Sequence, residues 1–286
     1  MTARSMMKGH TPSARSEASV AAMVRRYRRR CARARSGHRP TRTSPMDQIA
    51  QLRIEGEALL AAARTAGIDA PIEHCPGWSM QRLVSHTAKV FQRTAVVVAE
   101  GLLAPPANDR FTQFAKDDSV FDQYAEVLDE LVDALTHAVP NAPSWNFTGE
   151  DLTNSFWVRR MCNEAAVHRW DAQHAAGEAE GFAPELAVDI IDELLYILMP
   201  VLSAAKNPTL SSSFHLHCTD IDGEWLTSFT DGEPVTLREH AKGQLAVRGP
   251  ASSLCLWAWN RLPATEGGLE ALGDTDLLEA WTTIVP

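Results

Sequence analysis

Apolar residues recur every three to four positions from residue 47 to about residue 202, which is the spacing of amphipathic helices. Glycine and proline interrupt this pattern, and serine stands where two of the helices should begin. Ser79 is the expected N-cap of the second helix, and Ser119 with Asp122 resembles a capping box for the third. The pattern predicts five helices, over residues 47–66, 79–100, 119–138, 152–176 and 184–202.

Beyond residue 208 the apolar period falls to two, as in strands that bury one face. Two turn pairs, Asp222-Gly223 and Asp231-Gly232, predict antiparallel hairpins between these strands. The expected strands and closing helices are residues 214–218, 224–229, 234–238 and 244–248, then 251–261 and 274–284.

These elements predict a fold class that is mainly α plus α+β. A helical bundle of four main helices and a connecting one is expected over residues 47–205. A small α+β C-terminal domain is expected over residues 206–286.

The first 46 residues differ from the rest in charge. They hold 12 of the 27 Lys and Arg residues and one acidic residue, Glu17, for a net charge of +11; the remaining 15 basic and 35 acidic residues give −20. Because this segment is rich in Arg, Ser, Thr and Pro and poor in apolar residues, we expect a disordered basic arm. Three interpretations stay open: a transit peptide, a nucleic-acid-binding arm, or an upstream extension of a reading frame that naturally starts at Met46.

Composition excludes several classes of function for the acidic remainder. No apolar run approaches the roughly 20 residues that cross a bilayer, so no membrane span is expected. Neutralising nucleic-acid phosphates requires clustered Lys and Arg, so only the basic arm could bind nucleic acid. The five cysteines are scattered and form no C-x-x-C motif, which predicts free thiols and a cytoplasmic location.

Three residues carry the main candidate chemistry. His86 lies in the apolar stripe of the second predicted helix, and Glu164 and His168 lie four residues apart on one face of the fourth. Two imidazoles and a carboxylate can hold a divalent metal with one position open, as in catalytic zinc sites. The alternative is structural: Glu164 pairs with Arg160 one turn earlier, and both histidines belong to the core.

Other candidates admit two interpretations each. Cys75 could be a nucleophile or a packing residue, and Asp171 could orient a ligand imidazole or lie on the surface. His215 and His217 alternate on one strand, so they could chelate a metal or mark the solvent face of the strand. The tryptophans at 257 and 259 are expected in the core.

Two segments carry recognisable signatures: HCPGWSMQRLVSH at 74–86 and RRMCNEAAVHRWD at 159–171. The first resembles the C-P-G-W-(S/T)-x-x-x-L-(V/A)-x-H segment of the mycothiol-dependent maleylpyruvate isomerase family, and the second is similar to that family's second signature. VRGPASSLCLWAWNR at 247–261 and GDTDLLEAW at 273–281 are similar to its C-terminal domain. The resemblance covers residues 47–286 and leaves the basic arm unmatched.

The resemblance implies a DinB-like bundle that binds a divalent metal, with zinc as the expected ion, followed by a sterol-carrier-like domain. The family's His, Glu and His ligands fall on His86, Glu164 and His168. The thiol cosubstrate would be mycothiol, the low-molecular-weight thiol of actinobacteria. The metal-bound thiolate would add to a small electrophilic substrate, giving maleylpyruvate-type cis–trans isomerisation or S-transfer.

Two questions stay open at this level. Of the C-terminal basic residues, Arg238, Arg248 and Arg261 are the candidates to clamp an anionic substrate, and each could equally be a surface charge. A non-catalytic, metal-binding regulator or small-molecule sensor is the alternative to an enzyme.

Overall fold

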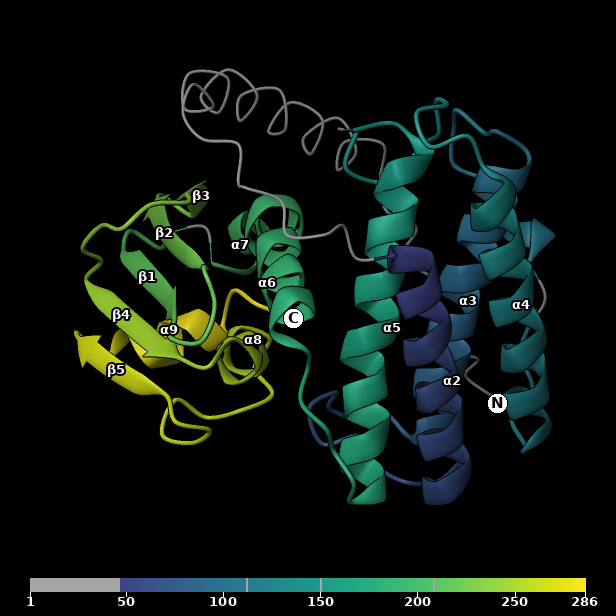
Figure 1. Ribbon diagram of the computed structural model, residues 1–286, viewed down its shortest axis with the longest axis horizontal. Helices are drawn as coiled ribbons and strands as arrows, with labels where there is room; N and C mark the ends of the chain where they lie inside the picture. The colour runs from purple at the N-terminus through teal and green to yellow at the C-terminus, as the bar shows by residue number, and fades with distance from the viewer. Residues whose placement is uncertain (1–46, 112, 150, 208) are drawn as a thin grey trace, which may run out of the picture. The chain divides into compact units, whose positions relative to one another are not determined.

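Four long helices form the first part of the molecule (Figure 1). The computed structural model describes residues 47–286 except 112, 150 and 208, so the predicted basic arm lies outside the described residues. Helix α2 packs against α5 and α4, and α3 packs against α4 and α5. Their buried faces carry leucine, valine and aromatic side chains such as Leu59, Phe91 and Tyr124. The helices are α2 (Gln48–Ala66), α3 (Met80–Ala99), α4 (Ser119–His137) and α5 (Asn154–Ala176).

The helix ends follow local chemistry at most of the predicted positions. Ser79 caps α3 by accepting a hydrogen bond from the backbone N–H of Arg82, and Gly177 ends α5 with a left-handed conformation. The predicted capping box at Ser119 is wrong. Ser119 is already the first residue of α4, and its hydroxyl donates to Asp117 instead of accepting from the helix.

The fifth predicted helix is one continuous run with a widened turn in its middle. Helix α6 (Pro184–Glu193) passes through a π-helical turn (Leu194–Leu198) into α7 (Met199–Lys206). Pro200 follows this turn, and proline has no N–H to donate to the carbonyl one turn earlier, so the regular ladder is interrupted there. Helix α6 packs against α8, and α7 packs against β3. The domain boundary between residues 205 and 206 stays a prediction.

A five-stranded sheet follows, in the order β3-β2-β1-β4-β5 (Figure 1). Both predicted hairpins are present, since β1 pairs antiparallel with β2 and β2 with β3, whereas β4 lies parallel to β1. Strand β5 was not predicted, because four residues are too few to show an alternating pattern. The elements are β1 (Ser213–Cys218), β2 (Glu224–Thr230), β3 (Glu233–Leu237), β4 (Leu245–Gly249), α8 (Ala251–Ala258), β5 (Glu270–Gly273) and α9 (Leu277–Thr282).

One face of this sheet is buried by helices. Phe214 on β1 is fully buried and contacts Trp281 of α9, whose ring stacks on Trp257 of α8. His215 and His217 lie on the opposite face. Of the two interpretations of these histidines, the solvent-face one is wrong for His215, which is only 9% exposed. The segment that joins β3 to β4 passes close over it, as described below.

Two class predictions can be compared with the structure directly. The described cysteines, at 75, 162, 218 and 255, all carry free thiols. Over residues 47–111, 113–149, 151–207 and 209–286, no helix combines the length and the hydropathy that a membrane span needs.

Candidate functional site

A cavity of about 690 Å³ lies where α3 and α5 meet the segment that follows α8. Most of its wall surface is apolar, and nine of the twenty residues that line it are polar or charged. This is the usual composition of a small-molecule site. The polar and charged side chains of the wall, together with two of its tryptophans, are those of His74, Cys75, Trp78, His86, Arg93, Thr94, Arg160, Glu164, His168, Trp259 and Arg261.

The three predicted ligand residues converge at this cavity. Glu164 Oε1 lies 3.2 Å from His86 Nε2 and 3.5 Å from His168 Nε2. One ligand atom from each of the three residues lies within 4.8 Å of the others. Glu164 and His168 are buried, whereas the His86 side chain is 39% exposed. The arrangement follows from the bundle: α3 and α5 pack together, and the i,i+4 spacing stacks Glu164 over His168.

Arg160 occupies the other oxygen of the same carboxylate. Its guanidinium pairs with Glu164 Oε2 and, 3.2 Å away, with Glu193 Oε2 of α6. The predicted ion pair with Arg160 is therefore present, but it uses only one carboxylate oxygen of Glu164. Oε2 pairs with Arg160, and Oε1 faces the two imidazoles. Burial opposes ionisation, but Arg160 and His168 hold the pKa of Glu164 well below its usual range, so the carboxylate is charged.

Behind His168 lies a buried ion pair. His168 Nδ1 lies 3.0 Å from Asp171 Oδ2, and Arg261 donates to both Asp171 oxygens at 3.1 and 3.0 Å. Asp171 is only 1% exposed, so of the two interpretations of this residue the surface one is wrong. Burial would raise the pKa of Asp171, but Arg261 and His168 lower it far below its usual value. This carboxylate fixes the ring of His168 so that Nε2 points toward Glu164.

The same charges act on His168 itself. Burial alone would lower its pKa, yet Glu164 and Asp171 raise that pKa to about 9. The pocket thus favours a positive charge between the carboxylates of Glu164 and Asp171. Protonated His168 supplies this charge, and a metal ion bound to neutral His168 would supply it instead. Two imidazole nitrogens, one carboxylate oxygen and a carboxylate behind one imidazole form a donor set that suits a divalent metal such as zinc. The residues therefore fit the ion that the resemblance implies.

The loop before α3 places an aromatic ring against both histidines. Ile72 donates its backbone N–H to the carbonyl of Trp78, and Gly77 adopts a left-handed φ of +77°, which closes the loop. The ring of Trp78 lies 4.9 Å from that of His86 and 6.3 Å from that of His168, between centroids. The Pro-Gly-Trp sequence therefore serves to restrict the orientation of the imidazoles.

Cys75 lines the cavity but is not an activated nucleophile. Its sulfur lies 3.9 Å from Asp171 Oδ2 and 3.8 Å from Arg261 Nη2. Burial, followed by the charge of Asp171, raises the pKa of this thiol to about 11. With this pKa, Cys75 is a neutral thiol near pH 7, and a neutral thiol is a poor nucleophile because the thiolate is the reactive species. Its surroundings therefore favour the packing interpretation.

The three candidate arginines lie in different places. Arg261 lines the cavity, with most of its donors engaged by Asp171 and the carbonyl of Trp259. Arg238 pairs with Asp192 and lies over the ring of Trp225, and Arg248 pairs with the exposed Glu270. Neither Arg238 nor Arg248 lines the cavity.

Three residues of the cavity wall carry buried polar atoms without partners in the described part of the chain. Among the described residues of its wall, His74 Nε2, Thr94 Oγ1 and Trp259 Nε1 are buried and have no hydrogen-bond partner. Leaving a buried polar atom unpaired costs about 1–3 kcal/mol.

Sequence and structure comparisons agree with this architecture. The family model described as "Mycothiol maleylpyruvate isomerase N-terminal domain" matches residues 49–173, and the one described as "MDMPI C-terminal domain" matches residues 185–280. The chain belongs to the mycothiol-dependent maleylpyruvate isomerase family. A comparison with curated proteins found no match.

Solved structures of this family share the fold. A crystal structure of the mycothiol-dependent maleylpyruvate isomerase is similar with a TM-score of 0.53 and 13% identity, over 84% of this chain and 94% of that chain. A mutant form of the isomerase gives a TM-score of 0.53 and 12% identity over the same shares. The predicted class, a helical bundle followed by an α+β C-terminal domain, is confirmed.

Sequence reasoning missed one cation of this family member's cavity. Arg93 lies in the wall, hydrogen-bonded to Asn108 Oδ1 and to the carbonyl of Pro106, and it lies over the ring of Trp145. The signal was present, because Arg93 follows His86 by seven residues, which is two helical turns on the same face. Among the residues that the structure describes, Arg93 pairs with no carboxylate, unlike Arg160 and Arg261.

Proposed function

We propose that this chain is a metal-dependent enzyme that activates mycothiol for addition to a small electrophilic substrate. The reaction is a maleylpyruvate-type cis–trans isomerisation or an S-transfer. Family membership supports the thiol, and one observation carries the proposal: His86 Nε2, His168 Nε2 and Glu164 Oε1 converge on one point of a cavity large enough for a small substrate.

These three atoms would hold the metal, and zinc is the expected ion. Three protein ligands would leave the ion able to bind one further ligand, such as a thiol, as in catalytic zinc sites. When bound there, a divalent ion lowers the pKa of a coordinated thiol, so that a thiolate is available near neutral pH. Arg160 retains Oε2 of Glu164, which leaves Oε1 as the oxygen available for coordination.

Isomerisation requires no net change in the thiol. The thiolate sulfur forms a bond to one alkene carbon, and the π electrons move onto the conjugated carbonyl group. The former double bond rotates as a single bond, after which the carbon–sulfur bond breaks and the thiolate leaves. In S-transfer the carbon–sulfur bond persists, and the leaving group departs or a proton is added to the neighbouring carbon. The chain contributes orientation of both reactants within a largely apolar cavity.

Arg93 is the side chain best suited to bind an anionic group of the substrate. It is a cation in the cavity wall with no carboxylate partner among the described residues, so its charge is not cancelled locally. Arg261 instead acts as a positioning residue, since its donors hold Asp171 and Asp171 holds His168.

Turnover by the purified full chain tests this function. Zinc-loaded protein is assayed with maleylpyruvate and with a panel of enones, epoxides and haloalkanes, with and without mycothiol. The matched variants are His86→Ala, which removes a ligand, and His137→Ala, which removes an exposed histidine of α4 outside the cavity. We expect turnover that requires both zinc and mycothiol, is lost in His86→Ala and is retained in His137→Ala.

The products separate the two reactions, because an isomer returns the thiol and S-transfer consumes it. Turnover that is independent of mycothiol would contradict the thiol assignment. A protein that binds zinc at His86 but converts none of the panel would favour the non-catalytic alternative.

A further inference from the structure

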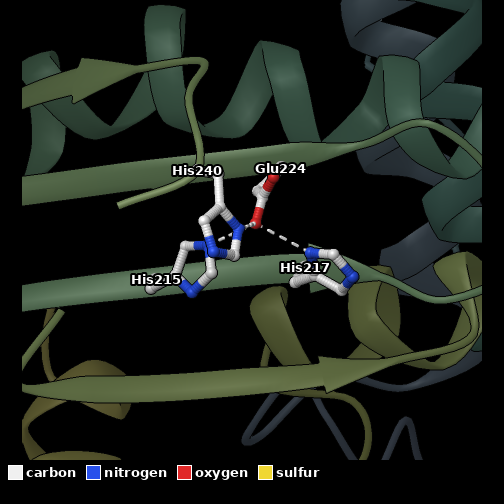
Figure 2. Close-up of side chains that lie close together, drawn as sticks. All are labelled: His215, His217, Glu224 and His240. Atoms are coloured by element: carbon white, nitrogen blue, oxygen red, sulfur yellow. Dashed lines mark hydrogen bonds and ion pairs between the residues drawn. The ribbon is translucent and has the colours of Figure 1, made fainter. Parts of the chain in front are cut away.

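Four side chains converge on the face of the sheet that the helices do not cover. His215 and His217 come from β1, Glu224 from β2, and His240 from the segment that joins β3 to β4 (Figure 2). None of the four lines the cavity described above. The cluster is therefore distinct from the candidate active site, and it does not depend on the proposed function.

A single oxygen stands at the centre of this cluster. Glu224 Oε1 lies 2.9 Å from His215 Nε2 and 2.8 Å from His217 Nδ1, and His240 Nδ1 also contacts it (Figure 2). One ligand atom from each of the four residues lies within 4.8 Å of the others. A carboxylate oxygen has two lone pairs, so three imidazole N–H groups cannot each form a full hydrogen bond with it. Three ring nitrogens thus share one carboxylate oxygen that cannot accept a full hydrogen bond from each of them.

Strand register and topology build the cluster from distant segments. His217 lies directly opposite Glu224 in the antiparallel β1–β2 pair, and His215 shares their face two residues away. The order β3-β2-β1-β4 forces the chain to cross β2 and β1 between Leu237 and Leu245, which brings His240 over them.

Glycine allows this crossing segment to lie close to β1. A Cβ atom at Gly243 would come within 2.8 Å of the backbone nitrogen of His215 and 3.1 Å of its Cβ atom. The close approach accounts for the burial of His215 and fixes the base of the segment that carries His240.

Burial and charge are compatible with a bound cation. Glu224 is 20% exposed at its side chain and His217 38%, whereas His240 is 82% exposed and can move to complete a site. The nearest cation in register is Arg248, which lies beside His217 on β4 and pairs with Glu270 at 2.7 Å. Its charge is therefore already compensated.

We propose that His215, His217, Glu224 and His240 form a second metal site, which binds a divalent transition metal of the zinc class. Three imidazoles and one carboxylate supply nitrogen and oxygen donors that suit zinc, whereas Mg²⁺ and Ca²⁺ prefer sites made only of oxygen. Four protein ligands fill a tetrahedral shell, so this site is structural: it ties the β3–β4 segment to β1 and β2.

Zinc titration of the metal-stripped full chain tests the proposal. The double variant His86→Ala/Glu164→Gln serves as the background, because it removes the bundle site. We expect this background to bind one equivalent of zinc through the sheet cluster. Cobalt in place of zinc should give the intense visible absorption of a tetrahedral site.

Two further substitutions on that background locate the bound ion. His240→Ala removes an exposed ligand outside the regular strands. His174→Ala is the matched control, because it removes a histidine of another candidate group, formed by Glu73, His74 and His174. Losing a residue that merely orients a ligand costs about 10–100-fold in affinity, so the loss of His240 should cost at least as much. His174→Ala should bind zinc as the background does.

Folding of each variant is checked by its circular dichroism without metal. A background protein that binds no zinc would overturn the proposal. So would a folded His240→Ala variant with unchanged zinc affinity, or binding that disappears with His174→Ala.

Discussion

Two clusters of imidazoles and a carboxylate occur in the molecule, and their surroundings differ. The bundle cluster consists of His86, Glu164 and His168, and the sheet cluster consists of His215, His217, Glu224 and His240. In the bundle, Arg160 holds the second oxygen of Glu164 and Asp171 holds the far nitrogen of His168, so each of these two side chains is held in place by a partner. On the sheet, one oxygen of Glu224 is shared by three imidazoles and one of them, on His240, is largely exposed. The first cluster offers three candidate ligands that line the cavity, whereas the second offers four, none of which lines that cavity. The surroundings of such a set of side chains, more than its composition, thus distinguish a site suited to chemistry from one suited to crosslinking.

The largest expected effect comes from Glu164→Gln. The amide keeps the size of the side chain but removes the charge that faces His86 and His168 and the ion pair with Arg160. We expect thiol-dependent turnover to fall about 100-fold or more, because the metal supplies several kcal/mol of stabilisation to such reactions. Steady-state kinetics and zinc content measure the change.

The matched control is Glu224→Gln, which makes the same substitution in the sheet cluster. It should leave turnover unchanged. Equal losses of turnover in the two variants would erase the contrast between the clusters.

Asp171→Asn should weaken both stability and metal binding. The buried guanidinium of Arg261 would lose its charged partner, which costs about 3–5 kcal/mol in the free energy of unfolding. His168 would lose the group that orients it, so zinc affinity of the bundle site should fall about 10–100-fold. Denaturant unfolding and zinc competition measure the two effects.

Asp129→Asn is the control for that experiment, since Asp129 forms an exposed ion pair with Arg53. Its effect on the free energy of unfolding should stay within about 0.5 kcal/mol. An Asp171→Asn variant with wild-type stability and wild-type zinc affinity would show that the support behind His168 is dispensable.

Arg93→Gln should affect substrate binding with little effect on folding. A charge-assisted hydrogen bond contributes about 1.5–3 kcal/mol, so KM for an anionic substrate should rise about 10- to 100-fold. We expect kcat, zinc content and the free energy of unfolding to change little, because Arg93 contacts neither Glu164 nor the histidines. If Arg238→Gln raised KM equally, the assignment of the anion-binding residue to the cavity wall would be wrong.

The smallest expected effect is that of His240→Ala on the intact chain. Turnover should stay at the wild-type level, while part of the stabilisation by zinc is lost. With free zinc at ten times the dissociation constant, a bound ion adds about 1.4 kcal/mol to the free energy of unfolding. Thermal melts with and without zinc measure this difference. A variant that melts below wild type by the same amount in both conditions would indicate a loss of packing in place of a loss of metal.

Local chemistry made much of the bundle predictable. Ser79 and Gly177 mark helix ends by their own backbone and side-chain preferences, and the i,i+4 spacing of Glu164 and His168 puts both on one face of α5. His86 lies opposite them because α3 packs against α5. The residues alone left this juxtaposition open, and the family resemblance implied it.

The features that the sequence left open depend on contacts between distant segments. His240 joins the sheet cluster only because the chain crosses two strands on its way to β4, and no periodicity indicates that crossing. The ion pair of Asp171 with Arg261 links residues 90 positions apart. The capping box at Ser119 failed because Asp117 competes for its hydroxyl, and a pattern four residues long cannot exclude such a competitor.

The metal content of two purified variants shows whether His86, Glu164 and His168 hold an ion. His240→Ala removes an exposed ligand of the sheet cluster, and His240→Ala/Glu164→Gln removes the bundle carboxylate as well. After exposure to zinc and removal of the excess, elemental analysis should find one zinc per chain in the first variant and none in the second. A folded His240→Ala protein that holds no zinc, or a double variant that still holds one, would contradict the assignment of the metal to His86, Glu164 and His168.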